Sequence, residues 1–123
     1  MIECVSQCSK AVERLKVAFR ACPKDFELLK SEVKAGRVSV YQLQGDNHNL
    51  IIAGEVLDDS YYLWGVVGHG VVSGIRELTQ YVRRSGLSNI SAETYFDGLA
   101  RLVRPLDTSE QTLQKTTRLE MRV

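Results

Sequence analysis

The spacing of hydrophobic residues changes along this chain from a helical to a strand-like period. Residues 3–21 carry apolar side chains at three- and four-residue steps, with charged residues between them: Val5, Cys8, Val12, Leu15 and Phe19. This spacing predicts a helix over 3–21. Pro23 marks its end, because the residue before a proline avoids helical dihedral angles. A second helix is predicted over 24–35, with Gly36 in the place of a left-handed cap.

Three segments rich in β-branched and aromatic residues follow: 37–43, 50–57 and 61–67. Such composition favours strands. The second segment is apolar almost throughout, so we expect it to be covered on both faces. The turn clusters at 45–49 and 58–60 are short, and short connections join antiparallel neighbours. The three strands therefore predict an antiparallel meander.

The rest of the chain alternates helices and strands. A helix is expected from Val71 to Arg84, a short strand over 89–92, a helix over 97–104 that Pro105 stops, and a final strand within 111–123. The helix between the third and fourth strands makes a crossover, so these two strands should form a parallel or splayed pair. We expect one α+β domain over 1–123, with a mixed sheet and the order α-α-β-β-β-α-β-α-β.

Composition excludes several classes of protein. Of 123 residues, 44% are hydrophobic and 25% charged, and the net charge of +1 gives no sign of a nucleic-acid or membrane partner. No segment approaches the ~18 apolar residues of a membrane span, and we expect no signal peptide. An odd number of cysteines, three, indicates a reducing, cytoplasmic setting in which they act as small buried apolar residues. No metal site is expected.

The turn Gly68-His69-Gly70 connects the third strand to the helix that begins at Val71. Amide groups in the first turn of a helix have no intrahelical acceptor, and the helix dipole favours an anion there. Glycine also lets the backbone approach phosphate closely. We therefore take residues 66–71 (Val66, Val67, Gly68, His69, Gly70 and Val71) as a candidate diphosphate site.

The order of elements, with this turn after the third strand, resembles the GNAT superfamily of N-acetyltransferases. The family signature Arg/Gln-x-x-Gly-x-Gly/Ala aligns with Gly65-Val66-Val67-Gly68-His69-Gly70, and a later motif, Asn-x-x-Ala-x-x-Leu/Tyr, aligns with residues 97–103. Relative to the family, the chain is expected to lack the strand before the first helix. A similar last helix occurs in small phage proteins of this type, which would place the chain in a virion.

The resemblance implies that acetyl-CoA, or another acyl-CoA, lies between the third and fourth strands and that an amine attacks its thioester. A base must accept the amine proton, and Glu93, Glu55 and His69 are the candidates. Glu93 follows the fourth strand, where apolar neighbours would desolvate it. Tyr95 is the candidate acid for the leaving thiolate, because the family often uses a tyrosine nearby.

A second hypothesis is a catalytically silent protein of this fold that binds or assembles, such as a phage virion component or a host-defence inhibitor. Gly65 stands where the family has Arg or Gln, and the Gly-Phe pair that often follows the last helix is replaced by Leu106-Asp107. Both differences favour this alternative. The final strand is expected to leave an edge open to a second copy, which predicts a homodimer.

Overall fold

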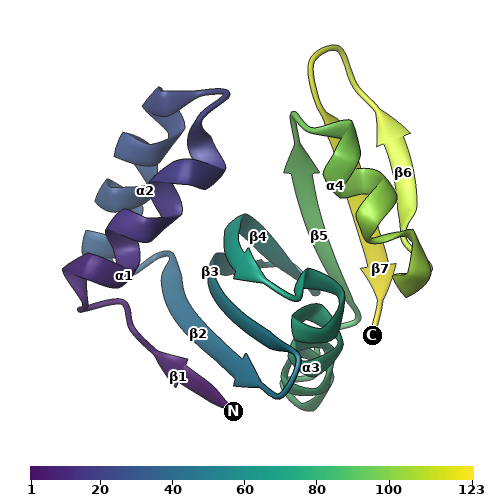
Figure 1. Ribbon diagram of the computed structural model, residues 1–123, viewed down its shortest axis with the longest axis horizontal. Coiled ribbons are helices and arrows are strands. Elements are labelled where there is room, and N and C mark those ends of the chain that lie inside the picture. Colours follow the sequence, from purple (N-terminus) through teal and green to yellow (C-terminus); the bar gives the residue numbers. More distant parts are fainter.

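A mixed sheet of seven strands forms the body of the protein in the computed structural model, which describes residues 1–123 (Figure 1). The strands are β1 Ile2–Cys4, β2 Ser39–Gly45, β3 His48–Leu57, β4 Ser60–His69, β5 Asn89–Thr94, β6 Ser109–Thr112 and β7 Thr117–Arg122. Their order in the sheet is β1-β2-β3-β4-β5-β7-β6. The predicted meander β2-β3-β4 is confirmed, and β4–β5 is the single parallel pair.

Helices cover both faces of this sheet. They are α1 Ser9–Arg14, α2 Pro23–Lys34, α3 Val71–Arg84 and α4 Asp97–Leu102, with short 3₁₀ turns η1 Leu15–Phe19 and η2 Arg104–Leu106. One core cluster joins α1, η1 and α2 to β2 and β3, and another joins α3 to the opposite face. Because β3 lies between these layers, Leu50–Gly54 is buried throughout. The burial predicted for the whole segment 50–57 is confirmed only for this part, since Val56 and Leu57 are exposed. The bounds predicted for α3 are confirmed.

The single helix predicted over 3–21 is wrong. Residues Ile2–Cys4 form β1, which pairs antiparallel with β2, and the helical segments begin only at Ser9. The Ser6 hydroxyl accepts a hydrogen bond from the Val40 amide at 2.8 Å, which holds the chain against β2 just after β1. Strand pairing thus overrides local helical periodicity. The chain has a strand before its first helix, contrary to the expectation from sequence.

The cysteines are not the buried apolar residues expected from their number. Cys4 and Cys8 are exposed, and Cys22 is half-buried. Cys4 is exposed because β1 is an edge strand, with only β2 beside it. Cys8 precedes α1 as its N-cap, outside the buried face that carries Ala11 and Val12.

The chain end is a hairpin rather than one strand. β6 and β7 pair antiparallel through a short turn, and β7 lies between β5 and β6. The open edge on this side therefore belongs to β6, whose four residues are all exposed. The prediction that the final strand is the open edge is wrong, and the homodimer inferred from it remains a prediction.

Candidate functional site

A wedge opens in the sheet where β4 and β5 separate. Their parallel pairing runs from Ser60↔Asn89 to Leu63↔Ala92 and then stops, although both strands continue. At this point β4 has a bulge: Ala53 of β3 is opposite Gly65 and Gly54 is opposite Leu63, so Trp64 has no partner. A bulge bends its strand and increases the local twist. This extra residue therefore turns β4 away from β5.

A cavity of about 660 Å³ occupies the wedge and reaches both faces of the sheet. On the α3 and α4 side its walls are aliphatic, and we call this part the aliphatic arm: Val66, Val71, Ile75, Leu99, Leu102, Val103, Leu106 and Met121. On the α2 side its walls carry aromatic and acidic side chains, and we call this part the polar chamber: Cys22, Asp25, Tyr62, Trp64, Glu93, Tyr95 and Phe96. The cavity thus joins an apolar channel to a polar one.

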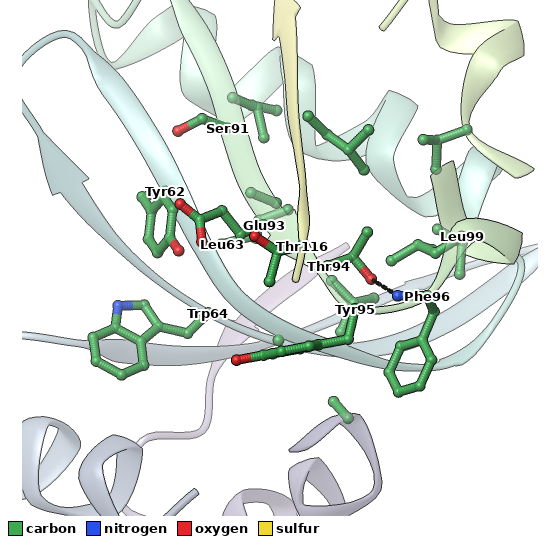
Figure 2. A pocket seen from close by; sticks show the side chains of 18 of the residues that line it. Tyr62, Leu63, Trp64, Ser91, Glu93, Thr94, Tyr95, Phe96, Leu99 and Thr116 are labelled. Carbon is green, nitrogen blue, oxygen red and sulfur yellow. Dashed lines mark hydrogen bonds between the residues drawn. The ribbon is translucent and has the colours of Figure 1, made fainter. Parts of the chain in front are cut away.

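The polar chamber is built from two strands that face each other across the wedge (Figure 2). Tyr62 and Trp64 project from β4, and the Glu93 side chain from β5 lies beside Tyr62. Burial, followed by the negative charge of Glu93, raises the pKa of Tyr62. The indole Nε1–H of Trp64 donates a 3.0 Å hydrogen bond to Glu55 Oε1 on β3, which fixes the plane of the ring.

Tyr95 lies at the mouth of the chamber, with 45% of its surface exposed. The adjacent Cys22, partial desolvation and the carboxylate of Asp25 raise its pKa. A tyrosine phenol is protonated at neutral pH even without this shift. Arg20 lies 4.2 Å from the centroid of the Phe96 ring, so the segment before α2 meets the end of β5 over the chamber. Tyr95 therefore presents a proton donor to the cavity.

The glycine turn is shaped by close packing. Gly68 and Gly70 have φ values of +123° and +76°, and a Cβ at either would lie 2.1 Å from a backbone oxygen of the β2–β3 hairpin, that of Asn49 or Asn47. Only glycine fits such positions. After Gly70 the amides of Val71, Val72 and Ser73 have no acceptor within the chain, and no side chain caps the helix. Of these three residues, Val71 lines the cavity.

Solved structures of N-acetyltransferases share this architecture. The ribosomal-protein-S18-alanine N-acetyltransferase of Escherichia coli superposes with a TM-score of 0.72 at 12% identity, over 100% of this chain and 93% of that one. A Bacillus subtilis acetyltransferase in complex with CoA gives 0.67 at 11% identity, over 99% and 97%. The PaiA N-acetyltransferase of Thermoplasma acidophilum, in complex with coenzyme A, gives 0.60 at 10%, over 100% and 99%. The chain has the GNAT fold. No family model and no curated protein matches the sequence.

Within this GNAT fold, the residues predicted for the site separate into two groups. Val66, Val71, Glu93 and Tyr95 line the cavity, whereas Val67, Gly68, His69 and Gly70 do not. Val67 packs with the α1–α2 core on the opposite face of β4. His69 is an exposed residue paired with Asn49 at the strand end. Glu93 is also exposed, so the apolar, desolvating surroundings expected for it are absent.

Sequence reasoning missed the aromatic wall of the chamber. Tyr62 and Trp64 alternate along β4, a spacing of two that places side chains on one face of a strand. That signal was present, but the bulge and the wedge beside these residues depend on strand pairing. Asp25 and Cys22 come from a distant segment that only the tertiary fold brings to this place.

The structure shows no group of three or more His, Cys, Asp or Glu side chains able to hold a metal ion. None of its helices combines the length and apolar character that crossing a membrane requires.

Proposed function

We propose that the protein binds an acyl-CoA in the wedge between β4 and β5 and transfers its acyl group to an amine. The observation that carries this proposal is the cavity, which passes between two separated parallel strands beside the uncapped start of α3. The solved structures with coenzyme A support the choice of ligand at the level of the fold. The acyl group is acetyl or a related one.

The chain offers matching chemistry for each part of this ligand. The aliphatic arm suits the pantetheine chain, since an apolar wall stabilises a bound apolar surface by roughly 25 cal/mol per Å². The free amides of Val71, Val72 and Ser73 suit the diphosphate. The coenzyme, when bound, supplies an activated thioester. β4 beyond Leu63 also has backbone groups on its β5 side that no strand pairs.

Gly65 explains why the diphosphate would rest on backbone amides alone. A Cβ at this residue would lie 3.1 Å from the Phe19 ring, which is tighter than an ordinary contact. The Arg or Gln that the family signature has here would therefore require the Phe19 ring of η1 to shift away from β4. We expect weaker coenzyme binding than a site with that side chain would give.

The polar chamber suits the amine. Glu93 and Asp25 give it negative charge, and the aromatic rings of Tyr62 and Trp64 favour a cation beside their faces. Glu93 accepts the proton that the amine loses, and Tyr95 donates a proton to the departing thiolate sulfur. Both residues come from the end of β5, and Tyr62 and Trp64 of β4 face them across the wedge.

Binding is tested by titration with acetyl-CoA, followed by the fluorescence of Trp64, the only tryptophan and a residue of the cavity wall. Thermal melts provide an independent measure, because a ligand at 100 times its Kd stabilises by about 2.7 kcal/mol. Val71→Glu places a negative charge beside the three amides, and Val71→Gln is its neutral control of the same shape. We expect Val71→Glu to bind at least about tenfold more weakly than Val71→Gln.

Folded wild-type protein that shows neither a fluorescence change nor a thermal shift with acetyl-CoA would contradict the proposal. It would then favour the second candidate, a catalytically silent protein of the GNAT fold. The specific observation behind that candidate is the missing diphosphate side chain at Gly65.

A further inference from the structure

His48 joins the β2–β3 hairpin to the first two turns of α3. Its side chain is buried, with 6% of the residue exposed, and both ring nitrogens are within hydrogen-bond distance of α3. Nδ1 lies 2.8 Å from Ser73 Oγ, and Nε2 lies 2.6 Å from Glu77 Oε1. A buried imidazole with two partners on one helix fixes how that helix can rotate.

The direction of these bonds follows from their chemistry. Burial by itself would raise the pKa of Glu77, but hydrogen bonds from the Met1 amine, His48 and Tyr81 together lower it, so the carboxylate is ionised and can only accept. Nε2 must therefore donate to Glu77. The Ser73 hydroxyl can donate to Nδ1 or accept from it, so all three side chains have hydrogen-bond partners.

The packing of Gly74 on α3 against the Leu50 side chain of β3 adds to this contact. A Cβ on Gly74 would lie 2.3 Å from Leu50 Cδ1, so helix and strand pack as closely as glycine permits. Together with the glycine turn, these contacts fix the distance between α3 and the hairpin, and the His48 hydrogen bonds fix the helix's rotation. Val71 and Ile75, by contrast, line the cavity.

We propose that His48, through Ser73, is a positioning residue for the diphosphate end of the coenzyme site. The inference rests on the proposed function, in which the amides of residues 71–73 receive the diphosphate. Hydrogen-bond donors act only at about 2.7–3.1 Å from their acceptor, so a small rotation of the first turn withdraws them. Displacements near 1 Å in an active site can cost about a hundredfold in rate. His48 sets this position from outside the cavity and touches no ligand.

The test compares two ligands that differ at the diphosphate: acetyl-CoA and S-acetylpantetheine, which has the thioester arm alone. His48→Phe keeps a planar ring but removes both hydrogen bonds, and Ser73→Ala removes only the bond within the first turn. We expect His48→Phe to raise the Kd for acetyl-CoA about tenfold and to leave the Kd for S-acetylpantetheine within about twofold. The measured quantity is the ratio of the Kd for acetyl-CoA to the Kd for S-acetylpantetheine. Ser73→Ala should raise this ratio as well, by a smaller factor than His48→Phe.

Tyr81→Phe is the matched control. Its hydroxyl donates a 2.9 Å hydrogen bond to Glu77 Oε2 one turn further along α3, so the variant disturbs the same carboxylate away from the amides. We expect it to change neither Kd. If His48→Phe does not fold, the ratio measured for Ser73→Ala decides.

Equal losses for both ligands would show that His48 acts on the whole fold, and would overturn the inference while the proposed function stands. An unchanged ratio in both variants would overturn it as well. Wild-type protein that binds neither ligand would instead refute the proposed function, and this inference with it.

Discussion

Replacing Gly70 by alanine tests why glycine stands in the turn before α3. Gly70 has φ +76°, and a Cβ there would lie 2.1 Å from the Asn47 carbonyl oxygen and 2.7 Å from His48 Cα. Gly86, after α3, has nearly the same backbone conformation, φ +82°, with no atom within 4 Å of its Cβ position. Gly70→Ala and Gly86→Ala therefore share the backbone effect and differ in the collision.

The magnitudes follow from these two terms. A left-handed conformation costs a non-glycine residue roughly 1–2 kcal/mol, and this applies to both variants. The collision at Gly70 forces the hairpin backbone to shift, and such overpacking typically costs about 1–3 kcal/mol more. We expect Gly86→Ala to lose about 1–2 kcal/mol and Gly70→Ala about 2–5 kcal/mol of the free energy of unfolding. That is a large share of the ~5–15 kcal/mol that holds a domain together.

Urea denaturation followed by circular dichroism measures both variants against the wild type, with equal m-values as the condition for comparison. If the two variants lose the same free energy, close packing against the hairpin is not the reason for glycine at residue 70. A Gly70→Ala protein as stable as wild type that no longer binds acetyl-CoA would refute the reasoning more strongly. That result would show that Gly70 is needed only for binding the diphosphate of the coenzyme.

Two further predictions concern the side chains of the wedge and of α3. Tyr95→Phe and Glu93→Gln should each lower kcat for release of the CoA thiol by about 10²–10⁴-fold, with little change in acetyl-CoA affinity. Stopped assays with a panel of primary amines measure this rate. A variant with unchanged kcat would show that its residue takes no part in the mechanism. Glu77 has a lowered pKa in the folded protein, so its contribution to stability is present at neutral pH and is lost as the pH falls below the unfolded value of about 4.3. The melting temperatures of wild type and Glu77→Gln should therefore converge from pH 7 to pH 3, and a constant gap would contradict the assignment.

Much of the fold could be read from local pattern. The meander, the glycine turn and α3 follow from strand-forming segments, turn residues and a clear helical period, and these are properties of neighbouring residues. The prediction for the N-terminal segment was wrong, because apolar spacing indicated a helix over residues that form a strand paired with β2. Local preference is worth only tenths of a kcal/mol per residue, so one edge pairing can reverse it.

The candidate site was harder to predict than the fold. Glu93 was predicted from its place after the fourth strand and Tyr95 from the family resemblance, and both line the cavity. Their catalytic roles stay predictions. The glycine turn was read as a cradle for phosphate, whereas Gly68 and Gly70 face the backbone of the β2–β3 hairpin. The sequence alone does not show which atoms lie beside the Cβ position of a glycine.

Local sequence was enough for the central meander, the turn glycines and α3, because each depends on residues a few positions apart. The wedge, the union of an aliphatic arm with a polar chamber, and the link from His48 to α3 came only with the three-dimensional fold. They require segments 25 or more residues apart to meet, as His48 and Ser73 do. Packing of whole elements against one another, through burial and strand pairing, decides which distant residues become neighbours.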